Sequence, residues 1–182
     1  MRTARVFETV AESVADCSLV VGLTAAQRRE LQQPIARLAD GIPQVREHGG
    51  RVALMFGSEK TGLSNEDMSY CHALIRIPTA PETPSMNLGQ AVAVCLYELR
   101  RDSRDANEAP ARRVRADAIA GSDAEQVTKM LLEVLEQSGY TKRITAVSTE
   151  QKIRRWVRRT RLSRRDAPLL LGILRQVLWK LR

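Results

Sequence analysis

Three short apolar runs, each followed by a loop of small residues, constrain the fold of this chain most. The runs span Leu19–Leu23, Val52–Phe56 and Ala73–Ile77, and each holds mostly aliphatic side chains. Runs of this length and composition predict buried strands. Because helical patterns separate them along the chain, the sequence predicts an open α/β sheet.

Capping residues and apolar periodicity predict the helices of this sheet domain. Ser64 is followed three positions later by an acidic residue, which is typical of a helix N-cap. Residues 5–16 predict a short helix, and residues 24–38 predict a polar segment that becomes helical, with Pro34 at a break or a start. A longer helix is predicted from Asn87. The expected apolar faces carry Val6, Val10 and Val14 on the first helix, and Leu88, Ala91, Val92, Cys95, Leu96 and Leu99 on the last.

The loops that follow the predicted strands favour ligand binding. The loop at 57–63 holds two glycines, which let a backbone approach a ligand closely. The loop at 78–85 is rigid with proline and leads into a helix N-terminus, where N–H groups are unpaired. Each loop alone is also typical of an ordinary turn. Together with residues 23–25, however, they lie where open α/β sheets bind small ligands, at the carboxyl ends of strands.

A small all-α module is predicted at residues 122–182, after a charged, alanine-rich linker at residues 102–121. Its three helices are predicted to begin at Ser122, near Ser148 and after Ser163. The second helix is expected to bury Ile153, Trp156 and Val157, and the third Ala167, Leu170, Leu171, Leu174, Val177, Leu178 and Leu181.

Two local signals mark the ends of the first of these helices. Ser122 and Glu125 have the spacing of a capping box, and Gly139 has the composition of a helix C-terminus. The three cysteines, Cys17, Cys71 and Cys95, are widely spaced and form no C-x-x-C pair. We expect them to be small buried hydrophobic residues rather than part of a disulfide or a metal site.

Charge is concentrated in the second half of the chain. Residues 1–99 carry 9 basic and 11 acidic side chains, a net charge of −2, whereas residues 100–182 carry 20 and 10, a net charge of +10. No apolar run is long enough to span a bilayer, and the first residues lack the apolar middle of a signal peptide. We therefore expect a cytoplasmic protein without a membrane partner, and nucleic acid is the first candidate partner of the basic half.

The positive charge is densest on the second predicted helix of the module. Eight cations stand within 14 residues that include no acid: Lys152, Arg154, Arg155, Arg158, Arg159, Arg161, Arg164 and Arg165. Helical spacing predicts that Arg154, Arg155, Arg158 and Arg159 lie opposite the apolar side. Such a stripe is compatible with an ordinary solvated face. We favour RNA binding, because a polyanion relieves the mutual repulsion of the cations and releases counterions.

The combination of loop motifs closely resembles a known family. The segments FGSEKTGLSNEDM, IRIPT and PSMNLGQAVAVCLYELR are similar to the second and third motifs of the SpoU/TrmH class of SPOUT RNA methyltransferases. The similarity is greatest to the TrmJ family of tRNA ribose 2′-O-methyltransferases, and it extends over nearly the whole chain. The resemblance implies an α/β domain at residues 1–101 with a trefoil knot that holds S-adenosylmethionine. It also implies a homodimer, no metal, and a helical extension that binds tRNA.

Site residues follow from the resemblance alone. Ser85 and Asn87 match polar residues of the third motif near the reacting ribose, and Glu59 matches a glutamate with a structural pairing role. The methyl-donor pocket is implied to include Leu23, Thr24, Ala25, Gly57, Ile77, Pro84, Ser85 and Met86.

The chain departs from the family pattern at its start. The opening N-x-G-x-x-x-R motif, which would supply an arginine for catalysis, is absent, and the first strands of the sheet are absent with it. We expect an upstream segment that supplies this motif, and a shortened relative is the alternative.

The expected activity is methyl transfer from S-adenosylmethionine to a ribose 2′-hydroxyl, in a tRNA anticodon loop or in ribosomal RNA. Two other functions fit parts of the sequence. A non-catalytic RNA-binding protein would account for the basic stripe and the missing motif. A helical protein–protein adaptor would account for the all-α module, but it leaves the loops of the sheet unexplained.

Overall fold

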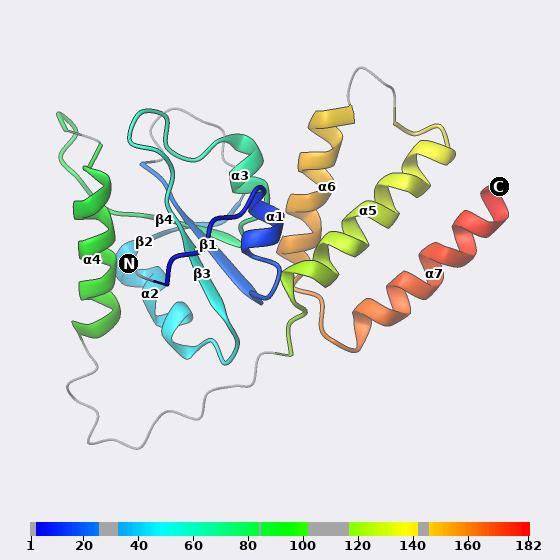
Figure 1. The fold of residues 1–182 in the computed structure, drawn as a ribbon, viewed down its shortest axis with the longest axis horizontal. Coiled ribbons are helices and arrows are strands. Elements are labelled where there is room, and N and C mark those ends of the chain that lie inside the picture. Colours follow the sequence, from blue (N-terminus) through cyan, green and yellow to red (C-terminus); the bar gives the residue numbers. More distant parts are fainter. Residues whose placement is uncertain (1–2, 26–32, 84, 102–116, 142–145) are drawn as a thin grey trace.

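A four-stranded parallel sheet forms the first half of the molecule (Figure 1). The computed structural model describes residues 3–25, 33–83, 85–101, 117–141 and 146–182. The strands are β1 (Leu19–Leu23), β2 (Ile35–Arg37), β3 (Val52–Met55) and β4 (Ala73–Arg76), in the order β2-β4-β1-β3. All three pairings are parallel, so the predicted strands and the α/β class are confirmed.

Strand β2 is an element that the sequence did not predict. Residues 35–37 pair with 74–76 of β4, and helix α2 (Leu38–Glu47) begins directly after them. The predicted helical start before Leu38 is therefore wrong. A three-residue edge strand is too short to show a period, and it forms because the neighbouring strand offers free backbone groups. The Leu74 N–H, for example, donates to the Pro34 carbonyl at 2.9 Å.

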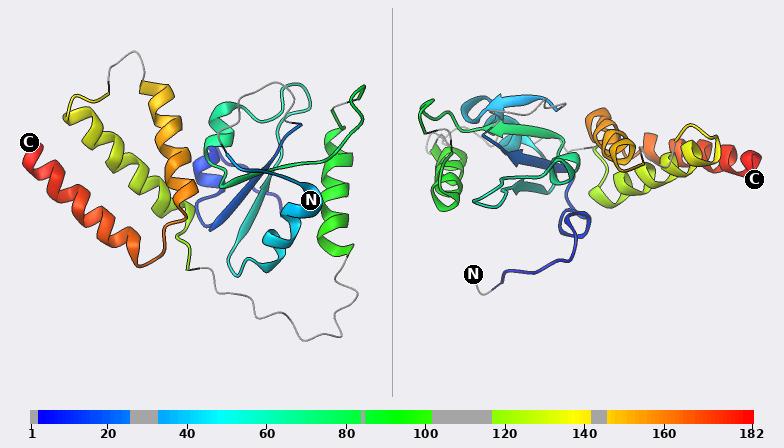
Figure 2. Two further views of the ribbon diagram at one scale, coloured as in Figure 1. Left: turned by 180° about the vertical axis from the view of Figure 1, so that it is seen from behind. Right: turned by 90° about the horizontal axis from the view of Figure 1, so that it is seen from above.

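Helices cover both faces of the sheet (Figure 2). On one face, α2 and α4 (Leu88–Arg101) pack with Val21 and Ile75. The other face buries Val20 and Leu74 beneath α1 (Val10–Ser13) and α3 (Asn65–Ser69). Successive residues of one strand thus enter different cores, as the two-residue period of a strand requires. All three cysteines are free and buried, which confirms their predicted packing role.

The two short helices differ in how well their ends were predicted. The Ser64 hydroxyl accepts from Asp67 N and the Asp67 carboxylate accepts from Ser64 N, so the predicted cap of α3 is confirmed. Helix α1 is a single turn that begins after Thr9, so the predicted helix over residues 5–16 is too long. Val6 is 98% exposed and does not share the buried face with Val14.

Three helices form the C-terminal module, as predicted: α5 (Gly121–Gln137), α6 (Ala146–Thr160) and α7 (Asp166–Leu181). Their core contains Ile119, Val127 and Val157, so the last residues of the predicted linker pack with the module. Gly139 has φ +74° after α5, and the Ser163 hydroxyl accepts from Asp166 N at the start of α7. Both of these predicted helix ends are confirmed.

The capping box predicted at Ser122 and Glu125 is wrong. Helix α5 begins at Gly121 with no side-chain cap, and the Glu125 carboxylate bonds Arg154 of α6 instead. A buried cation competes successfully for this carboxylate, because an unpaired charge in that position would be costly.

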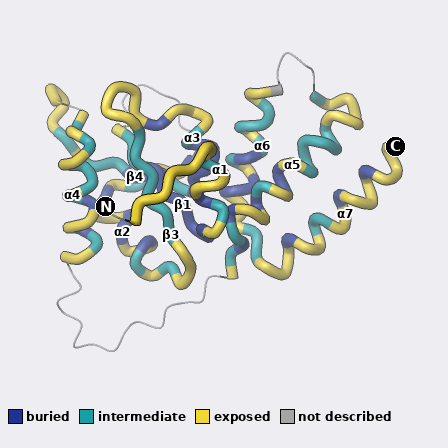
Figure 3. Tube along the Cα trace, viewed as in Figure 1, coloured by how far each residue is buried: buried dark blue, intermediate teal, exposed yellow. Residues whose placement is uncertain are grey.

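Helix α7 is less buried than its apolar sequence predicts (Figure 3). It packs against α5, while Leu169, Ile173 and Trp179 on its other side are exposed. Val177 is 38% exposed and Leu181 42% exposed, so their predicted burial is wrong. Trp156 of α6 is 44% exposed, so its predicted burial is also wrong. Among the described residues, no helix combines the length and the hydropathy that crossing a bilayer would require.

The helical module packs directly on the sheet domain. Helix α5 begins against α1, where Ser122 N donates to the Ala15 carbonyl at 2.8 Å. A Cβ on Gly121 would lie 2.2 Å from the Val14 carbonyl oxygen, so glycine is required for this close approach. Helix α6 packs against α3, which lies next to the carboxyl edge of the sheet.

Candidate active site

The loops that follow β1, β3 and β4 meet at the carboxyl edge of the sheet. The strands are parallel and adjacent, so Leu23, Gly57 and Ile77 leave the sheet at this one edge. Thr24 N donates to the Ile75 carbonyl at 3.0 Å, which ties the first loop to the last strand. The structure therefore brings the loops together as the strand order requires.

The loop after β3 is a closed turn that depends on Gly57. Gly62 N donates to the Ser58 carbonyl at 2.9 Å, and the hydroxyls of Ser58 and Thr61 lie 2.7 Å apart. A Cβ on Gly57 would lie 2.0 Å from the carbonyl carbon of Gly62, which is backbone and cannot move aside. Gly62 has φ +66°, a conformation that glycine adopts without strain.

Asn87 joins this turn to the loop after β4. Its Nδ2 donates to Glu59 Oε1 at 2.9 Å, and its Oδ1 accepts from Gly89 N at 2.9 Å and from Gln90 N at 3.3 Å. Asn87 therefore caps α4 and holds two loops together, which is a positioning role. This bond is compatible with the structural role predicted for Glu59. The bonding partner of Glu59 is Asn87, which lies on the neighbouring loop.

The remaining donor-pocket residues are aliphatic, small or exposed. Leu23, Ile77 and Met86 are half-buried, while Ala25 and Ser85 are exposed. Aliphatic walls of this kind are typical of pockets that hold the flat, largely apolar base of a nucleoside ligand. Pro84 lies outside the described residues.

The predicted basic face of α6 needs a correction. Lys152 and Arg159 are exposed and Arg155 is half-buried, whereas Arg154 is 4% exposed and Arg158 2% exposed. The prediction that these two arginines lie on a solvated face is wrong. Exposed Arg161, Arg164 and Arg165 continue the basic surface into the turn before α7.

Arg154 is buried because it connects the two parts of the molecule. Its Nη2 lies 3.0 Å from Glu125 Oε1, and its Nη1 donates to the Ser69 hydroxyl at 3.3 Å. The guanidinium also stacks over the Tyr70 ring, 4.3 Å from the centroid, and bonds Glu150 on its own helix. Burial alone would lower the pKa of Arg154, but the carboxylates of Glu125 and Glu150 outweigh it, raise the pKa and keep the cation charged. The sequence could not indicate this role, because the partners stand on α3 and α5.

Two titratable residues next to the sheet are structural. His72 Nδ1 accepts from Val20 N at 3.0 Å, and burial together with Arg158 and Arg161 lowers the pKa of His72 to about 3. Burial raises the pKa of the Cys71 thiol to about 12. Among the described residues, no three His, Cys, Asp or Glu side chains form a group that could hold a metal ion.

A parallel sheet with glycine-rich and proline-rich loops at its carboxyl edge is the architecture of α/β proteins that bind small ligands at that edge. The sequence model of the SpoU rRNA methylase family matches residues 2–97. This chain therefore belongs to the SpoU methylase family.

Individual relatives extend the match into the helical module. The chain is 34% identical to the tRNA (cytidine/uridine-2′-O-)-methyltransferase TrmJ of Yersinia pestis over 179 residues, which are 96% of this chain and 69% of that protein. It is 32% identical to TrmJ of Salmonella typhimurium over 185 residues, with 96% and 73% covered. The crystal structure of TrmJ from Z. mobilis superposes with a TM-score of 0.83 at 28% identity, covering 97% of this chain and 74% of that one.

Proposed function

We propose that this protein transfers a methyl group from S-adenosylmethionine to a ribose 2′-hydroxyl of RNA, and that tRNA is the substrate. The observation that carries the proposal is the loop junction at the carboxyl edge, where Glu59 and Asn87 hold the Gly57 turn against the start of α4. Membership of the SpoU methylase family and similarity to TrmJ proteins supply the reaction class.

The donor supplies a methyl group on a sulfonium centre, so the protein needs no electrophile of its own. Backbone groups of Thr24, Gly57 and Ile77 would hold the nucleoside, since these residues follow adjacent parallel strands. Leu23 and Met86 are half-buried and would cover its apolar faces. The main catalytic contribution expected of this arrangement is positioning of the hydroxyl in line with the methyl group.

Ser85 and Asn87 take different roles in this proposal. Ser85 is exposed at the end of the loop, so its hydroxyl is free to face the ribose. The Asn87 side chain is already bonded at both ends, to Glu59 and to the first turn of α4. We therefore assign Asn87 to positioning the loop and keep Ser85 as the residue that contacts the substrate.

The proposed RNA surface consists of the half-buried Arg155 and five exposed cations of α6 and the turn after it: Lys152, Arg159, Arg161, Arg164 and Arg165. Replacing one of these cations by a neutral residue should weaken binding to all RNA sequences about equally. It should also reduce the slope of log affinity against log salt concentration by about one. The proposal includes a cytoplasmic location and a homodimer. The trefoil knot stays a prediction.

A methyl-transfer assay tests the proposed reaction directly. The protein is incubated with S-adenosylmethionine that carries a tritiated methyl group and with unmodified tRNA. Label should enter the RNA, and alkaline hydrolysis should leave it in a dinucleotide, because a methylated 2′-oxygen cannot attack the adjacent phosphate. Ser85→Ala should lower the rate, while Gly172→Ala, on the exposed side of α7, should not. A folded protein that binds tRNA and transfers no label would be a non-catalytic RNA-binding relative.

A further inference from the structure

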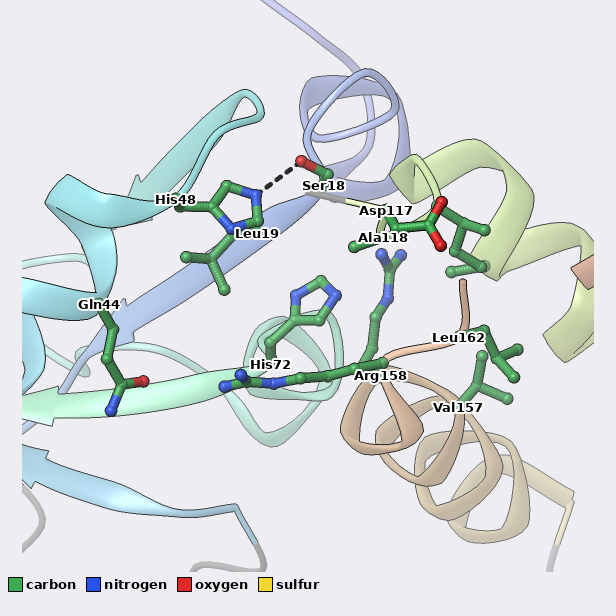
Figure 4. A pocket seen from close by; sticks show the side chains of 13 residues that line it. Ser18, Leu19, Gln44, His48, His72, Asp117, Ala118, Val157, Arg158 and Leu162 are labelled. Carbon is green, nitrogen blue, oxygen red and sulfur yellow. Dashed lines mark hydrogen bonds between the residues drawn. The ribbon is translucent and has the colours of Figure 1, made fainter. Parts of the chain in front are cut away.

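A cavity of about 260 Å³ lies between the sheet and the helical module, at the edge opposite the candidate active site (Figure 4). Ser18 and Leu19 open β1, and His72 directly precedes β4, so this is the amino edge of the parallel strands. Arg158 and Arg161 reach the cavity from the end of α6 and the turn after it. The cavity therefore shares no residue with the donor pocket.

Arg158 is the cavity residue whose hydrogen bonds are incomplete. Its side chain is 1% exposed, and its Nη2 donates to the Gly121 carbonyl at 3.3 Å and lies 3.9 Å from Glu125 Oε2. Its Nε and Nη1 are buried without a hydrogen-bond partner. The guanidinium rises between His72 and the segment of Asp117 and Ala118 (Figure 4). Buried donors on a charged group are rarely left unpaired, so an acceptor inside the cavity would satisfy them.

The other polar groups around the cavity are mostly donors. His72 accepts from Val20 N at Nδ1, so neutral His72 carries its proton on Nε2. Ser18 and His48 share one hydrogen bond of 2.8 Å, and Arg161 adds a second positive charge. Two carboxylates oppose them: Asp117 lines the cavity, and Glu125 Oε2 lies 3.9 Å from Arg158 Nη2.

The uncapped N-terminus of α5 adds to this preference. The helix begins at Gly121 with no side-chain cap, and Ala124 of its first turn lines the cavity. A helix N-terminus carries a partial positive charge that favours anions.

We propose that this cavity binds a phosphate group. Arg158, Arg161 and the Nε2 donor of His72 surround the cavity from different sides. A phosphate carries more negative charge and more acceptor oxygens than a carboxylate, so one ion can accept from several of these side chains at once. The inference is independent of the methyl-transfer proposal, because none of its residues lies at the carboxyl edge of the sheet.

Two substitutions at exposed positions test the site without disturbing the core. Calorimetric titration with inorganic phosphate should show saturable binding to the wild-type protein at constant ionic strength. Asp117→Asn removes the opposing charge and should tighten binding on the order of tenfold, while Arg161→Met should weaken it by a similar factor. Arg175→Met is the matched control, since Arg175 is an exposed arginine of α7 away from the cavity, and it should change nothing. Arg158→Met should abolish binding, and its folding is checked by circular dichroism.

The phosphate can come from a free small molecule or from the backbone of bound tRNA. If the phosphate belongs to tRNA, saturating tRNA should eliminate the heat released when inorganic phosphate is titrated into the protein. Asp117→Asn should then also tighten tRNA binding. If it is free, phosphate should bind equally well in the presence of tRNA. Either result supports the site. The proposal is overturned if phosphate gives no saturable heat, or if the affinity is the same in the Asp117→Asn, Arg161→Met and wild-type proteins.

Discussion

Protonation of His72 should destabilise the folded protein strongly below neutral pH. The folded-state pKa of His72 is lowered to about 3 by burial and by Arg158 and Arg161, against an ordinary value of 6.5. Between these two values the unfolded chain binds a proton that the folded chain rejects. The stability is therefore fully present above pH 6.5 and is lost as the pH falls toward 3.

The size of this loss follows from the pKa difference. Each pH unit in the window costs about 1.4 kcal/mol of unfolding free energy, so a change from about pH 6.5 to about pH 4.5 costs about 2–3 kcal/mol. Protonation would also remove the acceptor of the Val20 N–H, which lies 3.0 Å from His72 Nδ1.

The comparison protein for this test is His72→Asn. Asparagine offers Oδ1 as an acceptor near the position of Nδ1 and does not titrate. Urea denaturation, followed by circular dichroism at the two pH values, gives the loss of unfolding free energy for each protein. The wild type should lose about 2–3 kcal/mol more than the variant. Burial also lowers the pKa of His48, but His48 is present in both proteins, so its contribution cancels in the comparison. Equal losses in the two proteins would refute the reasoning.

Three further substitutions or reactions follow from single contacts. Arg154→Met removes the closest partner of the nearly buried Glu125 and leaves it Arg158 at 3.9 Å, so it should lower the unfolding free energy in urea titrations by about 3 kcal/mol, and a loss below about 1 kcal/mol would contradict the pairing. Gly57→Ala forces a Cβ against the Gly62 backbone and should lower the melting temperature by several degrees, and an unchanged value would show that the turn adapts. Cys71, with its pKa raised to about 12, should resist a thiol reagent in the folded protein and react after unfolding, so rapid labelling of native protein would contradict its burial.

The features that the sequence predicted well depend on neighbours along the chain. Strands β1, β3 and β4, the cap at Ser64, the start of α7 after Ser163 and the loop glycine at position 57 all have local physical causes. Strand composition and capping chemistry act over a few residues, so they can be read without knowing the tertiary contacts.

The features that the sequence predicted poorly depend on partners far away in the chain. Strand β2 exists because β4 lies beside it. Arg154 and Arg158 were predicted on a solvated face. Both are buried instead, because both form ion pairs with Glu125 of α5. Trp156 is displaced to the surface by that arrangement, because one helix face cannot bury both the arginines and the indole. Helical spacing identifies the residues of one face, whereas the neighbouring elements decide which face is buried.

The most direct test of the account is calorimetric titration of the protein with S-adenosylmethionine. The loops at the carboxyl edge should bind the donor saturably, and Gly57→Ala should abolish that binding because its Cβ displaces the Gly62 backbone. Gly172→Ala makes the same chemical change where no atom lies within 4 Å, so it should bind like the wild type. If a folded wild-type protein shows no binding, or if Gly57→Ala binds as tightly, the carboxyl edge is not the donor site.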